Sequence, residues 1–172
     1  SRHLTPMPEK LFTSQAPHGV PVIDVNDAVR DQRIQGVGGA MTDSSAYLIR
    51  KQLAPKAQAQ LLNNLFSPSG AGLNMVRLPI GASDYTAGGQ PYSYDDLPAG
   101  QSDPDLTHFS IDHDDAYIVP AMHDVLKINP STKIIATAWT PPAWMKTNGG
   151  FNNLGFSGHL LPGDWPLLAF ST

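Results

Sequence analysis

The stretch KIIATAWTPPAWMKTNG, residues 133–149, decides the fold class of this chain. Its first part, Ile134–Ala138, is short, apolar and β-branched and lies between Pro-Ser-Thr and Thr-Pro-Pro, which is typical of a buried parallel strand. Trp139 and Trp144 follow on a loop stiffened by prolines. Because α/β folds bind ligands at the carboxyl ends of parallel strands, a rigid aromatic plate here suits the apolar face of a sugar ring. The alternative is that both tryptophans are core anchors beneath the loop.

Two further segments repeat this pattern of a short strand followed by a polar loop. Arg33–Ala40 (RIQGVGGA) opens into glycines and is followed by Met41–Asp43, whereas Asn74–Ile80 (NMVRLPI) leads into Gly81–Asp84. Repeated units of strand, loop and helix predict a parallel sheet with crossover helices.

Arg77 places a charge inside the second of these apolar strands. Lys and Arg are almost never fully buried unless they are paired, so Arg77 is expected to point at a carboxylate or into a polar cavity. The alternative is an arginine that emerges at the edge of a strand.

The segment between the first two strands predicts two helices. Ser44–Ala54 has apolar positions at helical spacing and is expected to be capped by Thr42 or Asp43. Lys56–Phe66 predicts the second helix, since Pro55 suits the first turn of a helix.

The rest of the chain predicts one more helix and one long loop. Tyr85–Ser110 is polar and rich in Gly, Pro, Tyr and Asp, and a loop of this length is expected to form a wall of a substrate cleft. Asp114–Ile128 predicts a helix that Pro120 kinks, because an interior proline removes one hydrogen bond. Asn152–Thr172 shows little periodicity, and we assign no element to it.

Three separated motifs together resemble one enzyme family. The strings are GVGGAMTDSSA (residues 36–46), NMVRLPIGASDYT (74–86) and ATAWTPPAWMKTNGG (136–150). They occur in this order and spacing in the glucosylceramidase-like enzymes of glycoside hydrolase family 30, and the chain resembles these enzymes from about Leu11 to about Gly150.

The resemblance implies an α/β fold that is a partial (β/α)8 TIM barrel. Residues 31–172 would supply the first three strands or so of the barrel, and residues 1–30 would supply strands of a flanking β-sandwich, around Lys10–Thr13 and Val20–Val25. A whole eight-stranded barrel takes ~250 residues. We therefore expect the chain to be the front part of a longer protein and to require the remainder of the barrel and of the side domain.

The catalytic residues of the family are expected to lie outside this chain. Retaining glycosidases use two carboxyl groups ~5–5.5 Å apart, one as nucleophile and one as acid/base. The resemblance implies two glutamates at the ends of the fourth and seventh barrel strands. The only glutamate here is Glu9, in the N-terminal arm, and it matches neither motif.

The resemblance does imply substrate-binding residues within this chain. Asp84 would accept hydrogen bonds from two adjacent sugar hydroxyls, and charge-assisted bonds of this kind are roughly twice as strong as neutral ones. Trp139 would contact the sugar ring in the innermost subsite, and Arg77 would brace the catalytic carboxylates. The alternative for Asp84 is a loop cap within Ser83–Tyr85.

Other patterns predict no metal site and no cofactor. Asp112, Asp114 and Asp115 lack the glycine and glutamate of a calcium loop and predict a helix N-terminus instead. The six histidines show no ligand spacing, so His108 and His113 are expected to be surface residues. The glycines of the first strand do not form a dinucleotide-binding motif and are expected to let the backbone pass close to neighbouring loops.

Composition limits the classes of partner and the cellular location that we expect for this protein. The net charge of −4 without a basic patch argues against a nucleic-acid partner. The sequence has no run of about 18 apolar residues, so we expect no membrane span. No signal peptide precedes Ser1, so an export signal is expected to have been removed or never included. The low charged content of 15%, with 15 Gly and 16 Pro, favours an extracellular, secreted enzyme.

Two classes of function remain open at this point. The first is a retaining β-glycosidase that acts on glucosylceramide, with its place in sphingolipid metabolism, or on another β-glycoside. Its parent protein is alternatively an endo-β-glycanase of the β-1,6-glucanase or xylanase type. The second class is a non-catalytic fragment that at most binds carbohydrate. A glutamate-bearing acid/base strand encoded after Thr172 would distinguish the two.

Overall fold

The computed structural model describes residues 8–9, 11–12, 18–147 and 149, and the chain divides into two compact units, Ser1–Ile34 and Gln35–Thr172. The described residues of the first unit form turns and coil, and Val20–Val25 belong to no strand. Because a strand is defined by its pairing partner, the assignment of residues 1–30 to a side β-domain stays a prediction. The segment Asn152–Thr172 lies outside the described residues.

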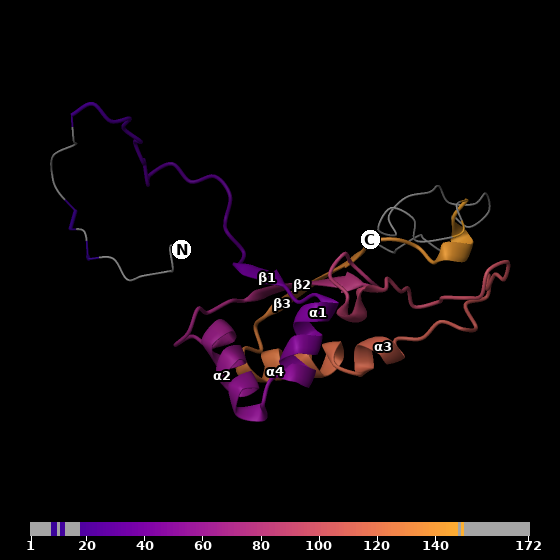
Figure 1. Ribbon diagram of the computed structural model, residues 1–172. Helices are drawn as coiled ribbons and strands as arrows, with labels where there is room; N and C mark the ends of the chain where they lie inside the picture. The colour runs from indigo at the N-terminus through magenta and orange to yellow at the C-terminus, as the bar shows by residue number, and fades with distance from the viewer. Residues whose placement is uncertain (1–7, 10, 13–17, 148, 150–172) are drawn as a thin grey trace. The chain divides into compact units, whose positions relative to one another are not determined.

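The second unit is built around a parallel sheet of three strands in the order β1-β2-β3 (Figure 1). These strands are β1 (Gly38–Ala40), β2 (Met75–Ile80) and β3 (Lys133–Ala138). In the register, Ala40 pairs with Arg77 of β2, and Arg77 pairs with Ile135 of β3. The predicted parallel sheet and the first three strands of a partial (β/α) barrel are confirmed.

β1 is shorter than the predicted strand because the chain before it makes other contacts. The backbone N–H of Val37 donates to the Asn74 side chain, at 2.9 Å, instead of joining the ladder. Within β1, a Cβ on Gly38 would lie 1.8 Å from the Met75 carbonyl oxygen, so only glycine fits there. Gly38 thus lets the backbone pass close to the neighbouring strand β2, whereas the prediction named neighbouring loops.

The first two helices follow the sequence prediction closely. Helix α1 (Asp43–Tyr47) continues directly as a π-helical turn over Leu48–Gln52. The Thr42 side chain caps α1, because its oxygen accepts from Ser45 N at 3.2 Å. Helix α2 (Pro55–Phe66) begins at its proline. Proline lacks a backbone N–H, which costs nothing here, because an N–H in the first turn of a helix has no intrahelical acceptor.

The third predicted helix is two helices, and the predicted kink at Pro120 is wrong. The structure has α3 (Asp112–Asp115) and α4 (Ile118–Ile128), separated at Tyr117, whose φ and ψ of −163° and −27° are not helical. Pro120 lies in the first turn of α4, where a proline costs no hydrogen bond. The break therefore precedes the proline.

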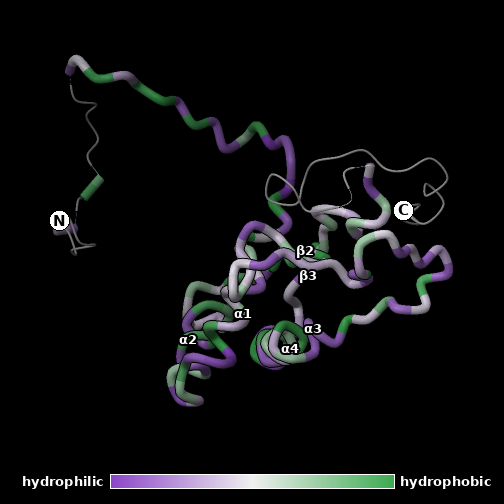
Figure 2. Tube along the Cα trace, turned by 45° about the vertical axis from the view of Figure 1, so that its right-hand side comes forward, coloured by the Kyte–Doolittle hydropathy of each residue, from purple (hydrophilic) through white to green (hydrophobic). Residues whose placement is uncertain are grey.

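The core lies between the sheet and the helices, which cover one face of it (Figure 1). Val76 of β2 is 2% exposed and packs against apolar side chains of α1, α2 and α4. Figure 2 shows that these helices carry both hydrophobic and hydrophilic positions, as amphipathic helices do. The fully buried or nearly buried members of this core are Met41, Ala46, Ile49, Leu62, Phe66, Val76, Tyr117, Ile118, Ala121, Met122 and Val125. No helix in the described part of the chain has the length and apolarity needed to cross a membrane.

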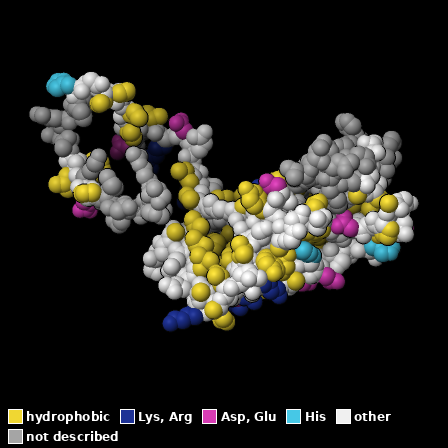
Figure 3. Space-filling view, viewed as in Figure 1, with side chains coloured by type: hydrophobic (Ala, Val, Ile, Leu, Met, Phe, Trp, Pro, Cys, Tyr) yellow, Lys and Arg dark blue, Asp and Glu magenta, His cyan; other side chains and the backbone are white. Residues whose placement is uncertain are grey.

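The expectation that β3 is buried is wrong for this chain. Ile134 and Ile135 are 44% and 46% exposed, because among the described residues β3 is an edge of the sheet and only β2 flanks it. A strand of this composition is typical of one buried on both faces. Hydrophobic side chains accordingly reach the surface of this unit in Figure 3.

We expect the 172-residue chain to associate in solution. The three strands among the described residues do not close a barrel, and in that part of the chain the outer edges of β1 and β3 present unpaired backbone groups beside exposed apolar side chains. Sedimentation velocity across a concentration series should show growing species, and a dye for exposed apolar surface should bind. A monomer with a sharp cooperative melt and no dye binding would contradict this expectation.

Candidate functional site

The structure brings Arg77 and Trp139 together at the carboxyl end of the sheet. The Arg77 guanidinium carbon lies 5.0 Å from the centroid of the Trp139 ring, which is a cation–π distance. Arg77 Nε also donates to the Thr137 hydroxyl at 3.1 Å. Because side chains alternate along a strand, Arg77 lies on the opposite face of β2 from Val76, away from the helices. In a closed barrel this face lines the interior.

The expected carboxylate partner of Arg77 is not found among the described residues. Its side chain is exposed, and its contacts there are a hydroxyl and an indole ring. The alternative of an edge position is wrong, since β2 is the central strand. Arg77 is therefore available to a carboxylate brought by other residues on the open face of the sheet.

Asp84 lies on the loop that follows β2, and its side chain is exposed. Within the described residues no hydrogen bond to its carboxylate is found. The neighbouring Ser83 hydroxyl accepts from Tyr85 N at 3.1 Å, so Ser83 and not Asp84 caps this turn. The carboxylate of Asp84 is thus left open to solvent or ligand.

An apolar cavity of about 260 Å³ opens beside Trp139. Trp139 is half-buried in its wall and is therefore neither a fully buried core anchor nor a free surface plate. The floor comes from the end of β2, one wall from the long loop 85–110, and the other from the loop after β3. The lining residues are Ile80, Gly81, Ser93, Tyr94, Asp95, Leu106, Phe109, Ala138, Trp139, Thr140, Pro141, Pro142 and Met145.

Trp144 has a different place from Trp139. Its ring nitrogen donates to the Asp95 carbonyl at 3.0 Å, which ties the loop after β3 to the loop 85–110. Nearby, Lys146 is buried and donates to the Thr140 hydroxyl at 3.0 Å, and its burial lowers the pKa of the Lys146 ammonium. Both contacts hold the loop that carries Trp139.

The buried carboxylate of Asp43 anchors the start of the long loop. It is 0% exposed and accepts from Ala87 N at 2.5 Å, while the Tyr117 hydroxyl and His113 Nε2 lie 2.5 and 2.7 Å from its other oxygen. The prediction that His113 is a plain surface residue is incomplete, because its 40% exposed ring is paired to Asp43. Sequence spacing could not reveal this contact, since the partners are 70 residues apart.

A second buried carboxylate orients a cavity residue. Asp114, predicted only as part of an acidic helix start, is buried and accepts hydrogen bonds from the hydroxyls of Tyr92, at 3.3 Å, and Tyr94. Burial raises the pKa of Asp114, against the effect of these bonds. Burial also raises the pKa of both tyrosines, which therefore stay protonated as donors at neutral pH. Tyr94 is thereby fixed in the cavity wall.

Among the described residues, the side chains placed to hold a metal ion are Asp95, Asp103 and His108, next to the same cavity. The predicted acidic group at residues 112–115 does not form such a site. Its members begin α3, and its buried member bonds to tyrosines.

Comparison with known proteins identifies the family of this chain. Residues 34–163 match the TIM-barrel domain of glycosyl hydrolase family 30, and the chain belongs to that family. It is 36% identical over 126 residues to the lysosomal acid glucosylceramidase of Mus musculus, covering 72% of this chain and 23% of that enzyme. It is 34% identical over 127 residues to an endo-1,6-β-D-glucanase of Aspergillus fumigatus, covering 74% of this chain and 25% of that enzyme.

Solved structures show the same relationship. SrfJ from Salmonella typhimurium superposes with a TM-score of 0.67 at 30% identity, over 76% of this chain and 27% of SrfJ. The chain thus spans about a quarter of the length of the relatives it matches.

Proposed function

We propose that this chain is the N-terminal part of a retaining β-glycosidase of the glucosylceramidase-like type. The observation that carries the proposal is the apolar cavity beside Trp139, with Arg77 over the tryptophan ring, at the carboxyl end of a family 30 barrel sheet. Ligand sites of TIM barrels lie at this end of the strands. An aromatic wall there suits the apolar face of a pyranose ring.

Within this proposal, three residues bind substrate and none performs the chemistry. Trp139 stacks on the sugar in the innermost subsite, and Asp84 accepts hydrogen bonds from its hydroxyls. Arg77 faces the open side of the sheet, where it stabilises catalytic carboxylates supplied by residues outside this chain. The chain's only glutamate is Glu9, so it does not hold the two catalytic glutamates that the family resemblance implies.

The natural substrate is a β-glucoside or a related β-glycoside, either a glycolipid or a glycan. Relatives named as a glucosylceramidase and as an endo-1,6-β-glucanase match at similar identity, which supports both classes. A role in sphingolipid metabolism follows only if the natural substrate is glucosylceramide. A secreted, extracellular enzyme is part of the same proposal, supported by the low charge and the high Gly and Pro content.

A substrate panel on the complete protein tests the proposal. Aryl β-glucoside, β-1,6-glucan, xylan and glucosylceramide should be offered to the same preparation at equal enzyme concentration. We expect turnover of the aryl β-glucoside and of one of the natural substrates, which assigns exo or endo action. If none of the four substrates is hydrolysed, the result contradicts the proposal and favours the alternative, that the chain is a non-catalytic fragment that binds carbohydrate.

A further inference from the structure

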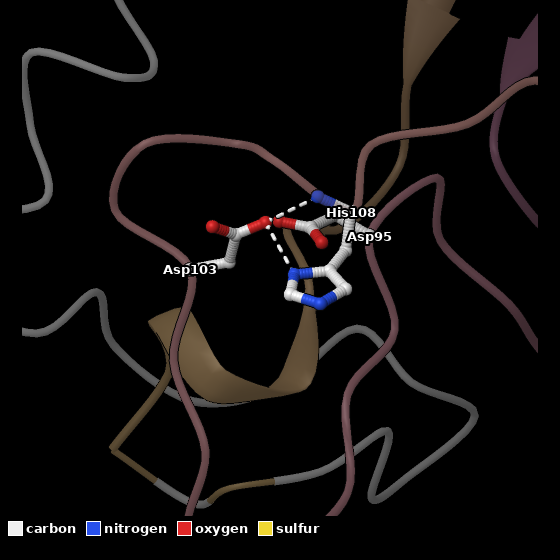
Figure 4. Close-up of side chains that lie close together, drawn as sticks. All are labelled: Asp95, Asp103 and His108. Atoms are coloured by element: carbon white, nitrogen blue, oxygen red, sulfur yellow. Dashed lines mark hydrogen bonds and ion pairs between the residues drawn. The ribbon is translucent and has the colours of Figure 1, made fainter.

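Three side chains from the loop 85–110 converge beside the cavity without being used by the proposed sugar site. They are Asp95, Asp103 and His108, whose potential ligand atoms all lie within 4.8 Å of one another. Figure 4 shows the two carboxylates and the imidazole ring turned toward a common point. No spacing pattern in the sequence predicts this group, because the loop must fold back on itself to form it.

Asp103 is fixed in place by hydrogen bonds from residues that follow it in the same loop. One of its carboxylate oxygens accepts from the backbone N–H of His108, at 2.6 Å, and the His108 ring Nδ1 lies 3.0 Å from that oxygen. The Thr107 hydroxyl donates to the other oxygen at 3.0 Å. The Asp103 carboxylate and the His108 ring are therefore held side by side.

Asp95 lies next to the Asp103 carboxylate and is itself buried. Its side chain is 2% exposed, and in the described part of the chain neither of its carboxylate oxygens accepts a hydrogen bond. A buried carboxylate without partners is costly, and a second carboxylate nearby adds repulsion. Either a cation or a proton must therefore compensate Asp95.

We propose that Asp95, Asp103 and His108 bind a divalent transition-metal ion, with Zn²⁺ as the best fit. Two carboxylate oxygens and one imidazole nitrogen form a mixed donor set that suits zinc better than magnesium or calcium, which prefer oxygen alone. Tetrahedral ligands at ~2.0–2.2 Å from zinc lie ~3.3–3.6 Å from one another. The His108 Nδ1 and Asp103 oxygen are already 3.0 Å apart, so zinc would take the place of the proton on Nδ1 with little movement, and that proton would pass to solvent.

The surroundings give this site an entry path and a structural role. The His108 side chain is 65% exposed, whereas that of Asp103 is 5% exposed, so an ion and its water ligand reach the group from the His108 side. Asp95 also lines the cavity, and its carbonyl accepts from Trp144. A bound ion would join three positions of the loop 85–110 and so hold Asp95, the residue that Trp144 of the next loop contacts. This inference does not depend on the proposed hydrolytic activity.

Metal titration of the full 172-residue chain tests the proposal. Isothermal titration with Zn²⁺ in a non-chelating buffer should give one site per chain with micromolar or tighter affinity, and zinc should raise the melting temperature. Co²⁺ serves as a spectroscopic probe, because a nitrogen- and oxygen-ligated site of low coordination number gives visible absorption bands that zinc then displaces. Absence of both the heat and the bands in the wild-type chain would overturn the proposal and favour a protonated Asp95.

Matched variants locate the site. Asp95→Asn and His108→Gln each remove one ligand and should weaken zinc binding about 100-fold or more, because even outer-shell changes cost 10- to 100-fold. Asp105→Asn removes the same charge from an exposed residue of the same loop and should bind like the wild type. His108 is largely exposed, so its variant should fold. Wild-type affinity in both ligand variants would mean that zinc binds elsewhere and would overturn the assignment.

Discussion

Replacing Trp139 with alanine in the complete enzyme should lower kcat/KM by roughly 10- to 150-fold and leave the melting temperature nearly unchanged. The indole ring is half-buried in the cavity wall, and Arg77 lies over it. Burial of a large apolar side chain against a ligand is worth ~1.5–3 kcal/mol, and each 1.36 kcal/mol is a tenfold change in rate. Since Pro141 and Pro142 stiffen the loop, we expect it to keep its course without the ring.

The chain offers a matched control for this substitution. Trp144→Ala makes the same change in the same loop, but Trp144 holds the loop 85–110 through the Asp95 carbonyl and does not line the cavity. It should therefore lower the melting temperature more than Trp139→Ala does. If Trp139 is a core anchor, the pattern reverses, because truncating a buried tryptophan costs ~3–5 kcal/mol of stability while the folded fraction keeps normal kinetics.

Asp84→Asn belongs to the same experiment and probes the sugar hydroxyls. The substitution keeps the shape of the side chain but removes its charge, so two charge-assisted hydrogen bonds become neutral ones. We expect a loss of about 2–4 kcal/mol in transition-state stabilisation, since contacts to the hydroxyls tighten as the ring distorts. The exposed position of Asp84 predicts little effect on stability. Near-normal kcat/KM in both folded variants would end the assignment of Asp84 and Trp139 to the sugar site.

The 172-residue chain alone should show no measurable turnover of an aryl β-glucoside. General acid–base catalysis contributes ~10²–10⁴-fold, and the covalent step adds to it. With Glu9 as the only glutamate, in the N-terminal arm, neither contribution is available from a carboxylate pair of the family type. The assay compares the purified chain with a buffer blank at high protein concentration and long incubation. Turnover above the blank that survives further purification would mean that an aspartate of this chain performs the chemistry.

Local sequence patterns were sufficient to predict most elements of the barrel unit and their parallel arrangement, but not the break between α3 and α4. Apolar runs bounded by Gly and Pro located β2 and β3 to within a residue, and Thr42 and Pro55 marked two helix starts. These features depend on neighbours in sequence. The exposure of β3 does not, because it depends on which strand pairs with its far edge.

The candidate site was predictable only in part for the same reason. The family resemblance implied that Arg77 lies close to the site of Trp139, and the structure places the two side chains 5.0 Å apart. The buried carboxylates of Asp43 and Asp95 were missed, because each is surrounded by residues distant in sequence or folded back within one long loop. A buried aspartate in a polar stretch looks in sequence like any loop residue.

The anomeric configuration of the first-formed product tests the central claim most directly. Proton NMR during hydrolysis of an aryl β-glucoside by the complete protein separates the two anomers before they interconvert. A retaining enzyme, with its carboxyl groups ~5–5.5 Å apart, passes through a covalent intermediate and releases the β-anomer first. We predict early accumulation of β-glucose. Initial release of α-glucose, or no hydrolysis of any β-glycoside, would contradict the assignment of this chain to a retaining β-glycosidase.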